Sequence, residues 1–368
     1  MAASGPMQLA LAAAREARGR TSPNPWVGAV VVRDRRVVAT GATEPPGGRH
    51  AEAVALDAAG DAARDSDLYV TLEPCGPFPG KRTQPCAERI AAAGLARVFV
   101  AMEDPDPNVD GGSIASLRAQ GIDVRVGGGS DEATALLRPY IKHRRTGMPY
   151  VIAKWASSLD GRIATASGDS RWITGEAARA RVHEERAWVD AILTGSGTVL
   201  ADDPELTARP GGTLAARQPV RVILDARGRT PPTARTLQRP GTVIVATTAA
   251  SDPAWRTAIA AAGAQVIEAE PSERGVNLRQ VLQSLGARGV LSVWTEAGGT
   301  LLGSLFDEDL VDEAWAFIAP LVIGGDNARP AVGGEGAAAI SSAWRLFEPA
   351  IEHIGDDVLV RGFTRATV

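Results

Sequence analysis

Runs rich in valine and isoleucine alternate with helical patterns of about ten residues along the N-terminal part of the chain. The strand-like runs cover residues 28–32, 37–40, 67–75, 96–105 and 122–127. The helix-like runs cover residues 7–18, 50–60, 86–94 and 111–121. The first two strand-like runs flank a short polar turn and predict a hairpin. Helices separate the later runs, as they do in parallel crossovers, so the pattern predicts an α/β fold.

The pattern restarts near residues 141–150, which read IKHRRTGMPY and predict a linker. A chain of 368 residues is too long for one ordinary domain, so we expect a first domain over 1–146 and a second over 147–368. The strand-like runs of the second region cover residues 149–158, 190–196, 219–225, 241–248, 264–270, 289–296 and 312–320. Its helix-like runs cover residues 175–188, 253–263 and 277–286. This region is therefore also expected to be α/β.

Charge and hydropathy exclude two classes of partner. The net charge is −4 at pH 7, whereas binding nucleic acid without sequence preference requires a basic surface. No apolar run approaches the roughly 18 to 20 residues that span a bilayer. Arg15, Glu16 and Arg18 interrupt the apolar N-terminal stretch, so no secretory signal is formed. We expect a cytoplasmic protein with no nucleic-acid and no membrane partner.

The only two cysteines, Cys75 and Cys86, flank a loop that contains Lys81 and Arg82. By themselves the two thiols are compatible with a disulfide, with buried core positions or with a metal site. A structural disulfide is rare in a reducing compartment. Free cysteines often pack as small apolar side chains. The residues that precede them decide between the remaining two.

A histidine and a glutamate complete a pattern that favours metal. His50-Ala51-Glu52 opens a helix-like run, Cys75 ends a strand-like run and Cys86 opens the next helix. One imidazole and two thiolates fill three positions of a zinc site and leave one for water. Glu52 stands close enough to His50 to handle protons without binding the metal. Each part alone fits an ordinary helix start or a core cysteine, but H-x-E followed by P-C and a second cysteine is typical of zinc deaminases.

The segments Pro23–Gly28, His50–Glu52 and Val70–Cys75 resemble the deaminase half of the bifunctional riboflavin-biosynthesis deaminase/reductase family. The resemblance implies a cytidine-deaminase-like fold. It implies hydrolytic deamination of 2,5-diamino-6-ribosylamino-4(3H)-pyrimidinone 5′-phosphate, in which Glu52 carries a proton to the leaving amine. It also implies that Asn24 lies near this substrate.

Two glycine-bearing turns follow strand-like runs of the second region, at 195–198 and 298–303. Such turns let backbone amides approach a pyrophosphate, but neither forms the G-x-G-x-x-G of a Rossmann domain. Residues 154–162, 167–174, 201–209 and 296–298 resemble, in this order, the reductase half of the same family. The resemblance thus covers nearly the whole chain and implies a C-terminal dihydrofolate-reductase-like α/β domain that uses NADPH.

The reductase resemblance also implies two sets of contacts. NADPH would contact Ala156, Trp172, Thr198, Asp202, Ala226, Gly298, Gly299, Thr300, Leu301, Leu302, Gly303 and Ser304. The substrate would contact Ser170, Arg186, Leu206, Arg209 and Glu296. Arg186 and Arg209 can fork onto a phosphate. Lys154 and Glu296 are the candidates for proton handling when a hydride reaches C1 of the opened ribose and gives a ribityl chain.

The loop between the cysteines is longer than the family's usual form and lacks its histidine, and Gly41-Ala42-Thr43 stands where another histidine is usual. A related deaminase/reductase that acts on another pyrimidine or pteridine-like substrate is therefore an alternative. A nucleic-acid-binding or base-editing protein is a third hypothesis and would need a basic, aromatic groove. We expect Lys81 and Arg82 to bind the phosphate of the deaminase substrate, and we expect a homo-oligomer, a dimer or larger.

Overall fold

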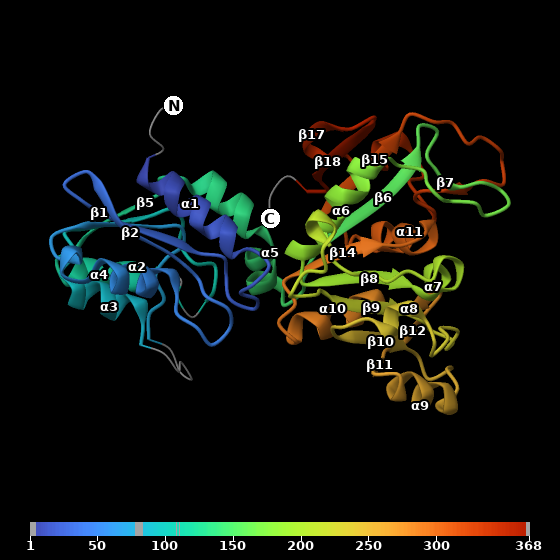
Figure 1. The fold of residues 1–368 in the computed structure, drawn as a ribbon, viewed down its shortest axis with the longest axis horizontal. Coiled ribbons are helices and arrows are strands. Elements are labelled where there is room, and N and C mark those ends of the chain that lie inside the picture. Colours follow the sequence, from blue (N-terminus) through green and yellow to red (C-terminus); the bar gives the residue numbers. More distant parts are fainter. Residues whose placement is uncertain (1–4, 78–83, 108, 110, 366–368) are drawn as a thin grey trace. The chain divides into compact units, whose positions relative to one another are not determined.

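The computed structural model describes residues 5–77, 84–107, 109 and 111–365. The chain forms two compact units, Met1–Gly147 and Met148–Val368 (Figure 1). Each unit has its own sheet with helices on it, as the alternating pattern predicted. Across the described part of the chain, every helix is too short or too polar to cross a bilayer.

The first unit is built on a five-stranded sheet in the order β2-β1-β3-β4-β5. Its strands are β1 (Gly28–Arg33), β2 (Arg36–Ala42), β3 (Asp67–Val70), β4 (Arg97–Val100) and β5 (Asp123–Val126). Strands β3, β4 and β5 run parallel, as the helical crossovers predicted. Strand β1 is antiparallel to both neighbours, because the β1–β2 hairpin reverses the chain before it crosses to β3.

Five α-helices cover the two faces of this sheet. They are α1 (Pro6–Ala17), α2 (Ala51–Ala59), α3 (Cys86–Ala93), α4 (Gly112–Ala119) and α5 (Ser130–Thr146), with the short 3-10 turn η1 (Gly60–Ala63) after α2. Helices α1 and α5 lie on one face, and α2, α3 and α4 lie on the other (Figure 1).

Two hairpin glycines allow the helices to approach this closely. A Cβ added to Gly28 would lie 1.9 Å from the carbonyl oxygen of Ala10 in α1. A Cβ added to Gly41 would lie 2.3 Å from the carbonyl oxygen of Ala51 in α2. Any side chain at either position would therefore push a helix off the sheet.

The predicted linker over 141–150 is mostly helical in the structure. Helix α5 continues to Thr146, Gly147 ends it with a φ of 71°, and the next strand begins at Tyr150. The α5 sequence gives a weak helical signal, because it is rich in charged residues and carries Pro139 inside the helix. The connection between the last helix and the next strand is therefore short.

The second unit is built on a nine-stranded sheet in the order β11-β10-β9-β8-β14-β6-β15-β18-β17. Its strands are β6 (Tyr150–Ser158), β8 (Ala191–Gly195), β9 (Val220–Leu224), β10 (Val243–Thr247), β11 (Gln265–Glu268), β14 (Ser292–Glu296), β15 (Glu313–Ala319), β17 (Phe347–Ile354) and β18 (Asp357–Phe363). Two small ribbons pair β7 (Arg162–Ala164) with β16 (Arg329–Pro330) and β12 (Pro271–Ser272) with β13 (Gly275–Val276). The hairpin of β17 and β18 adds an antiparallel edge that the sequence pattern did not predict.

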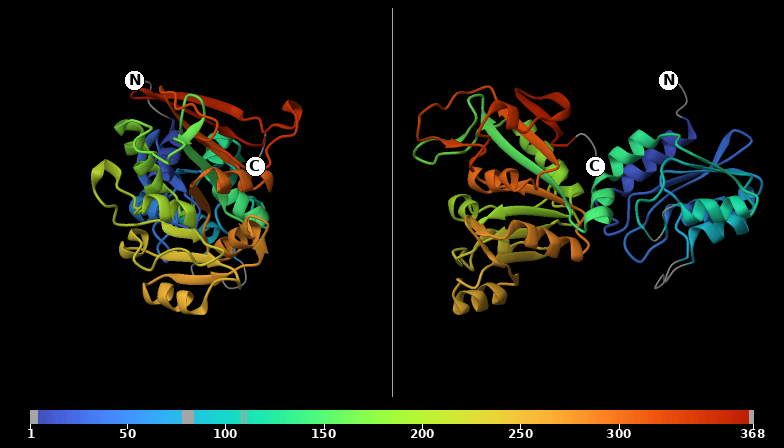
Figure 2. Two further views of the ribbon diagram at one scale, coloured as in Figure 1. Left: turned by 90° about the vertical axis from the view of Figure 1, so that its right-hand side faces the viewer. Right: turned by 180° about the vertical axis from the view of Figure 1, so that it is seen from behind.

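Helices pack on both faces of the large sheet. They are α6 (Glu176–Trp188), α7 (Ser196–Asp202), α8 (Arg235–Gln238), α9 (Pro253–Ala261), α10 (Leu278–Ala287) and α11 (Gly299–Asp307), with the 3-10 turns η2 (Pro210–Gly212) and η3 (Ile340–Ser342). Helix α9 packs beside β11, as Figures 1 and 2 both show.

Alternate residues of each central strand enter different cores. Val151 and Ala153 of β6 pack with residues of α10 and α11, whereas Tyr150 and Ile152 pack with residues of α6. This alternation is the strand period of two, and it explains why β6 is apolar on both faces. Polar side chains can lie at the ends of these strands, because the strand ends extend beyond the two apolar cores.

Candidate functional site

Three side chains converge at one point of the first unit. His50 precedes α2, Cys75 follows β3 and Cys86 is the first residue of α3. His50 Nδ1 lies 3.4 Å from Cys75 Sγ and 3.5 Å from Cys86 Sγ, and the three donor atoms lie within 4.8 Å of one another. The two cysteines form no disulfide.

The donor set fits a zinc ion. Bonds of about 2.0 Å to nitrogen and about 2.3 Å to sulfur at a tetrahedral angle place those ligand atoms roughly 3.5 Å apart, as the distances from His50 do here. The backbone N–H of Cys86, at the start of α3, lies 3.5 Å from Cys75 Sγ. Such a donor at a helix N-terminus favours the thiolate that binds metal.

Glu52 is buried beside this cluster, with only 3 % of its surface exposed. It lies in the first turn of α2, two residues after His50. Burial is the main cause that raises the pKa of Glu52 to about 7, and the neighbouring Cys75 adds to it. A carboxyl with this pKa both accepts and donates a proton near neutral pH.

The remaining predicted residues of this site are Asn24, Lys81 and Arg82. Asn24 lies in the turn between α1 and β1, where its N–H donates to the carbonyl of Thr21 at 2.8 Å. The Thr21 hydroxyl donates back to the Asn24 carbonyl at 2.9 Å. Lys81 and Arg82 lie outside the described residues, so the phosphate contact expected of them stays a prediction.

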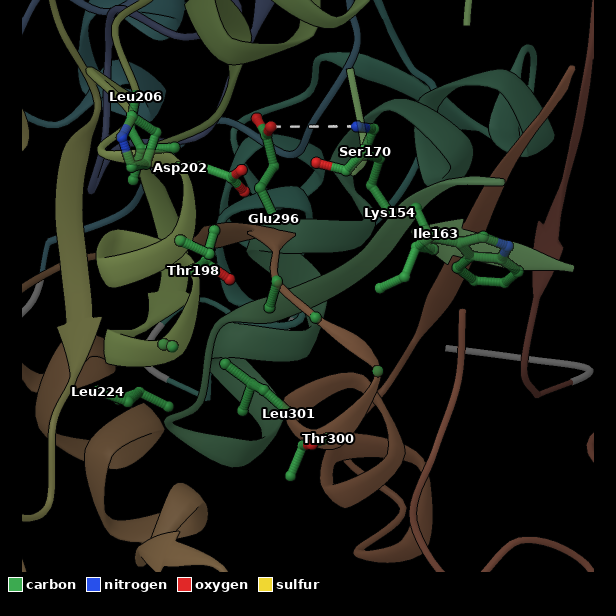
Figure 3. Close-up of a pocket in the computed structure, with 18 of the residues that line it drawn as sticks. Lys154, Ile163, Ser170, Thr198, Asp202, Leu206, Leu224, Glu296, Thr300 and Leu301 are labelled. Carbon is green, nitrogen blue, oxygen red and sulfur yellow. Dashed lines mark ion pairs between the residues drawn. The ribbon is translucent and has the colours of Figure 1, made fainter. Parts of the chain in front are cut away.

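The second unit contains a cavity of about 1710 Å³ (Figure 3). This volume exceeds the roughly 300 to 1,000 Å³ of a pocket for one drug-sized ligand, so a cofactor and a substrate have room together. Its wall includes Lys154 of β6 and residues that follow the carboxyl ends of β8, β9 and β14. The carboxyl ends of parallel strands are the usual place for a ligand in such a sheet.

Most residues predicted for the reductase line this cavity. They are Lys154, Ala156, Ser170, Trp172, Arg186, Thr198, Asp202, Leu206, Arg209, Ala226, Glu296, Gly298, Gly299, Thr300, Leu301 and Ser304. Leu302 and Gly303 are not among the lining residues. Leu302 is fully buried in the apolar core, and a Cβ on Gly303 would lie 2.3 Å from the carbonyl carbon of Gly333.

Lys154, Arg186 and Glu296 form a charged cluster in the wall, and each side chain is mostly buried. Strands β6 and β14 pair in a register that places Lys154 opposite Glu296. Lys154 Nζ lies 4.0 Å from Glu296 Oε2, and Figure 3 shows the two side chains pointing toward each other. Arg186 donates to both carboxylate oxygens, from Nε at 2.5 Å and from Nη2 at 2.8 Å.

The cluster perturbs both ionisable partners. Burial would raise the pKa of Glu296, but Arg186 and then Lys154 outweigh it and lower the pKa to about 2. Burial lowers the pKa of Lys154, while the nearby Glu296 opposes this shift. At neutral pH Glu296 is therefore a carboxylate, and Lys154 gives up its proton more readily than an ordinary lysine.

Glu205 gathers three arginines at another part of the wall. Arg209, Arg235 and Arg239 each form an ion pair with its carboxylate, and Arg209 Nη1 lies 2.8 Å from Glu205 Oε2. One carboxylate among three guanidinium groups leaves excess positive charge, which suits a phosphate. Arg186 is less available, because Glu296 and the carbonyl of Thr207 occupy its donors.

Two helix N-termini open onto the cavity and fit a dinucleotide. Gly195 precedes α7 and Gly298 precedes α11, and both glycines line the cavity. A Cβ on Gly298 would meet nothing within 4 Å, so the backbone is open there. The first N–H groups of a helix lack partners within it and favour a pyrophosphate. Thr198 of α7, and Thr300 and Leu301 of α11, are labelled around this opening in Figure 3.

Sequence patterns gave no indication of the contacts that two residues make at this site. Trp294 donates from Nε1 to Glu296 Oε1 at 3.1 Å, although the residue is fully buried and reads as core. Glu205 lies inside a segment that resembles the reductase half, yet only the fold shows that it collects three arginines. Glu205 lines the cavity, and its partners Arg235 and Arg239 lie 30 and 34 residues further along the chain, so no local pattern reveals this cluster. Trp294 lies only two residues before Glu296, but its apolar surroundings predict a core residue.

Comparisons with known proteins cover both units. The family model for the RibD C-terminal domain matches residues 149–360, and the model for the cytidine and deoxycytidylate deaminase zinc-binding region matches residues 3–102. The riboflavin biosynthesis protein RibD of Bacillus amyloliquefaciens is 42 % identical over 353 residues, which are 96 % of this chain and 94 % of the relative. RibD of Escherichia coli (strain K12) is 40 % identical over 369 residues, with 96 % of each chain covered.

Solved structures also match almost the whole chain. Acinetobacter baumannii RibD aligns with a TM-score of 0.87 and 38 % identity, covering 97 % of each chain. A diaminohydroxyphosphoribosylaminopyrimidine deaminase/5-amino-6-(5-phosphoribosylamino)uracil reductase from Thermotoga maritima aligns with a TM-score of 0.83 and 33 % identity, again over 97 % of each chain.

Proposed function

This chain belongs to the RibD family of bifunctional deaminase/reductases of riboflavin biosynthesis, and we propose which of its residues carry the two reactions. We assign deamination to residues 1–146 and reduction to residues 147–368. The substrates we assign are those in the description of the Thermotoga maritima relative, a diaminopyrimidine ribosyl phosphate and then the corresponding uracil. The observation that carries the first assignment is the meeting of His50, Cys75 and Cys86 beside the buried Glu52.

In the deaminase unit, His50, Cys75 and Cys86 would hold the zinc ion. When bound, zinc supplies the Lewis acidity that makes water a nucleophile near neutral pH. Glu52 accepts a proton from the attacking water and delivers it to the departing amine. A carbon–oxygen bond forms at the ring carbon, the carbon–nitrogen bond breaks, and ammonia leaves. The pKa of about 7 suits Glu52 to both proton transfers.

In the reductase unit, the openings before α7 and α11 would hold the cofactor. When bound, NADPH supplies a hydride for C1 of the opened ribose. The added hydride requires one proton, and Lys154 is the donor because its pKa is lowered and it borders the cavity. Glu296 is ionised and therefore orients Lys154 instead of donating a proton itself.

The substrate phosphate in this unit would bind at the arginine-rich wall. Arg209 commits Nη1 to Glu205 but keeps 40 % of its side chain exposed, and Ser170 also lines the cavity. The guanidinium group of Arg186 already donates two hydrogen bonds to Glu296, so we assign Arg186 the role of positioning that carboxylate. Arg209 is then the residue that contacts the phosphate. Lys81 and Arg82 remain our candidates for the phosphate in the deaminase unit.

Two further parts of the proposal concern the protein in its cell. The two cysteines form no disulfide, and thiols that bind metal stay reduced in the cytoplasm, which supports a cytoplasmic enzyme. We also propose a homo-oligomer, a dimer or larger, which sedimentation of the purified protein would measure.

The test is to give the purified protein the diaminopyrimidine ribosyl phosphate and to follow ammonia and NADPH separately. Ammonia should appear without NADPH, and NADPH should be consumed only once the ring has been deaminated. A zinc chelator should stop ammonia release and leave reduction of the pre-deaminated substrate intact. Failure to release ammonia from this substrate would show that the deaminase unit acts on another ring.

A further inference from the structure

Glu73 is a buried carboxylate two residues before Cys75, and only 2 % of its surface is exposed. Burying an ionised carboxylate is costly unless hydrogen bonds or a charge compensate it. In this unit the compensation comes from donors that lie between the end of β4 and the first turn of α4, namely Asp104, Gly111, Ser113 and Ile114. The side chain therefore joins the metal-ligand segment to a part of the chain that follows a different strand.

Both oxygens of Glu73 are used. Oε1 accepts hydrogen bonds from the Ser113 N–H at 3.1 Å, the Ser113 hydroxyl at 2.7 Å and the Ile114 N–H at 3.2 Å. Oε2 accepts from the N–H groups of Asp104 at 3.2 Å and Gly111 at 3.0 Å. A carboxylate that accepts five hydrogen bonds from one segment is held in a single position and holds that segment in return.

The position of Cys75 depends on such contacts, because it lies beyond the end of its strand. Strand β3 ends at Val70, so the ladder does not fix the residues that lead to Cys75. The Glu73 N–H donates to the carbonyl of Met102 at 3.0 Å, and the Cys75 carbonyl accepts from the Ala87 N–H at 3.2 Å. The backbone before Cys75 is therefore hydrogen-bonded to the segment after β4, and the backbone of Cys75 itself is hydrogen-bonded to α3. Most of the hydrogen bonds before Cys75 are those of the Glu73 side chain.

We propose that Glu73 is a positioning residue of the metal centre. Its five hydrogen bonds set the backbone of Cys75 so that Sγ stands at 3.4 Å from His50 Nδ1. The inference rests on the proposed function, because it takes His50, Cys75 and Cys86 as the zinc ligands. Residues that orient metal ligands commonly change metal affinity by about 10- to 100-fold when they are replaced.

A purely structural role would look different. If Glu73 only stabilised the start of α4, its loss would lower the stability of the metal-free unit and leave the geometry of the metal centre unchanged. Zinc affinity and the ligand field of the bound metal report that geometry directly. The experiment therefore measures zinc binding by chelator competition, the absorption spectrum of the cobalt-substituted full-length protein and the stability of the metal-free protein.

The variant is Glu73→Gln, which keeps the shape but replaces one accepting oxygen with a donor. The matched control is Glu103→Gln, an exposed carboxyl on the same unit. We expect Glu73→Gln to bind zinc about 10- to 100-fold more weakly and to shift the cobalt spectrum, with the control unchanged. Zinc affinity and a cobalt spectrum equal to those of the control, with or without a loss of metal-free stability, would overturn the proposal.

Ser113→Ala decides the matter if Glu73→Gln does not fold. It removes one of the five donors, so zinc affinity should fall by about fivefold, and an unchanged affinity would overturn the proposal. Failure of the zinc assignment itself is separable, because then Cys75→Ser would bind zinc as well as the wild-type protein does. Reduction of pre-deaminated substrate should be the same in all of these variants.

Discussion

Arg186 donates two hydrogen bonds to the carboxylate of Glu296, and both side chains are mostly buried, with 12 % and 13 % exposed. The pairing compensates a charge that would be costly to bury alone. It also leaves Lys154 as the group of this cluster that can release a proton into the cavity. The same ion pair therefore affects both the stability of the second unit and the proton transfer that we assign to Lys154.

Arg186→Met should destabilise the second unit. It leaves the mostly buried Glu296 with Lys154 and the Trp294 N–H as partners, and breaking a buried pair on one side typically costs about 3 to 5 kcal/mol. The control is Arg365→Met in the same unit, whose exposed pair with Asp309 should contribute less than about 1 kcal/mol. Denaturant unfolding of the second unit measures both. Equal losses in the two variants would show that the Glu296 charge is compensated elsewhere.

Lys154 should set the alkaline limit of the reductase. A proton donor must be protonated, so the reduction rate should fall as pH rises through the pKa of Lys154, which burial places below that of an ordinary lysine. Lys154→Arg keeps the positive charge beside Glu296 but donates no proton near neutral pH. That variant should lose about two to four orders of magnitude in the reduction rate while still binding NADPH. A rate close to wild type in Lys154→Arg would assign the proton to another donor.

Arg209 should serve the phosphorylated substrate and not the cofactor. Arg209→Ala removes a charged hydrogen-bond donor, worth roughly 1.5 to 3 kcal/mol, so KM for the substrate should rise by about one to two orders of magnitude. Arg239→Ala is the matched control, because Arg239 also pairs with Glu205 but is not among the cavity-lining residues. KM for NADPH should change little in either variant. Similar effects of the two substitutions on the substrate would point to Glu205 and not to a phosphate contact.

Glu52 should be needed for deamination but not for holding metal. Glu52→Gln should keep its zinc and release ammonia about two to four orders of magnitude more slowly, because the proton shuttle is lost. Glu88→Gln, an exposed carboxyl in α3, is the control. Zinc content, ammonia release and reduction of the pre-deaminated substrate are measured together. Normal ammonia release by Glu52→Gln would show that another group moves the proton.

The local patterns were sufficient to predict most strands and helices of both units. The alternation of short apolar runs with helical stretches has the periods that strands and helices impose, and these periods survive in one sequence. Helix α5 was missed because charges and Pro139 obscure its period, and the exposed strand β17 was missed because it shows little apolar alternation. The periodic pattern of apolar residues is weak where a helix or strand does not bury one continuous apolar face.

The metal-binding residues could also be predicted from the sequence. The imidazole precedes α2, one thiol follows β3 and the other begins α3, so all three stand at the ends of secondary-structure elements. The chemistry of His50, Cys75 and Cys86 therefore suggests their meeting before any coordinate is known. The five hydrogen bonds of Glu73 are not suggested in this way, because all of their donors lie 31 to 41 residues further along the chain.

The sequence by itself determined the alternating elements, the division of the chain into two α/β regions and the donor atoms available for zinc. Only the tertiary structure decided that Lys154 stands opposite Glu296 and that the guanidinium group of Arg186 pairs with that carboxylate. It also decided that Glu205 forms ion pairs with three arginines. The physical reason is that periodicity and residue type act over neighbouring positions. Strand register, burial and the pKa values that follow from them depend on which distant segments the sheet brings together.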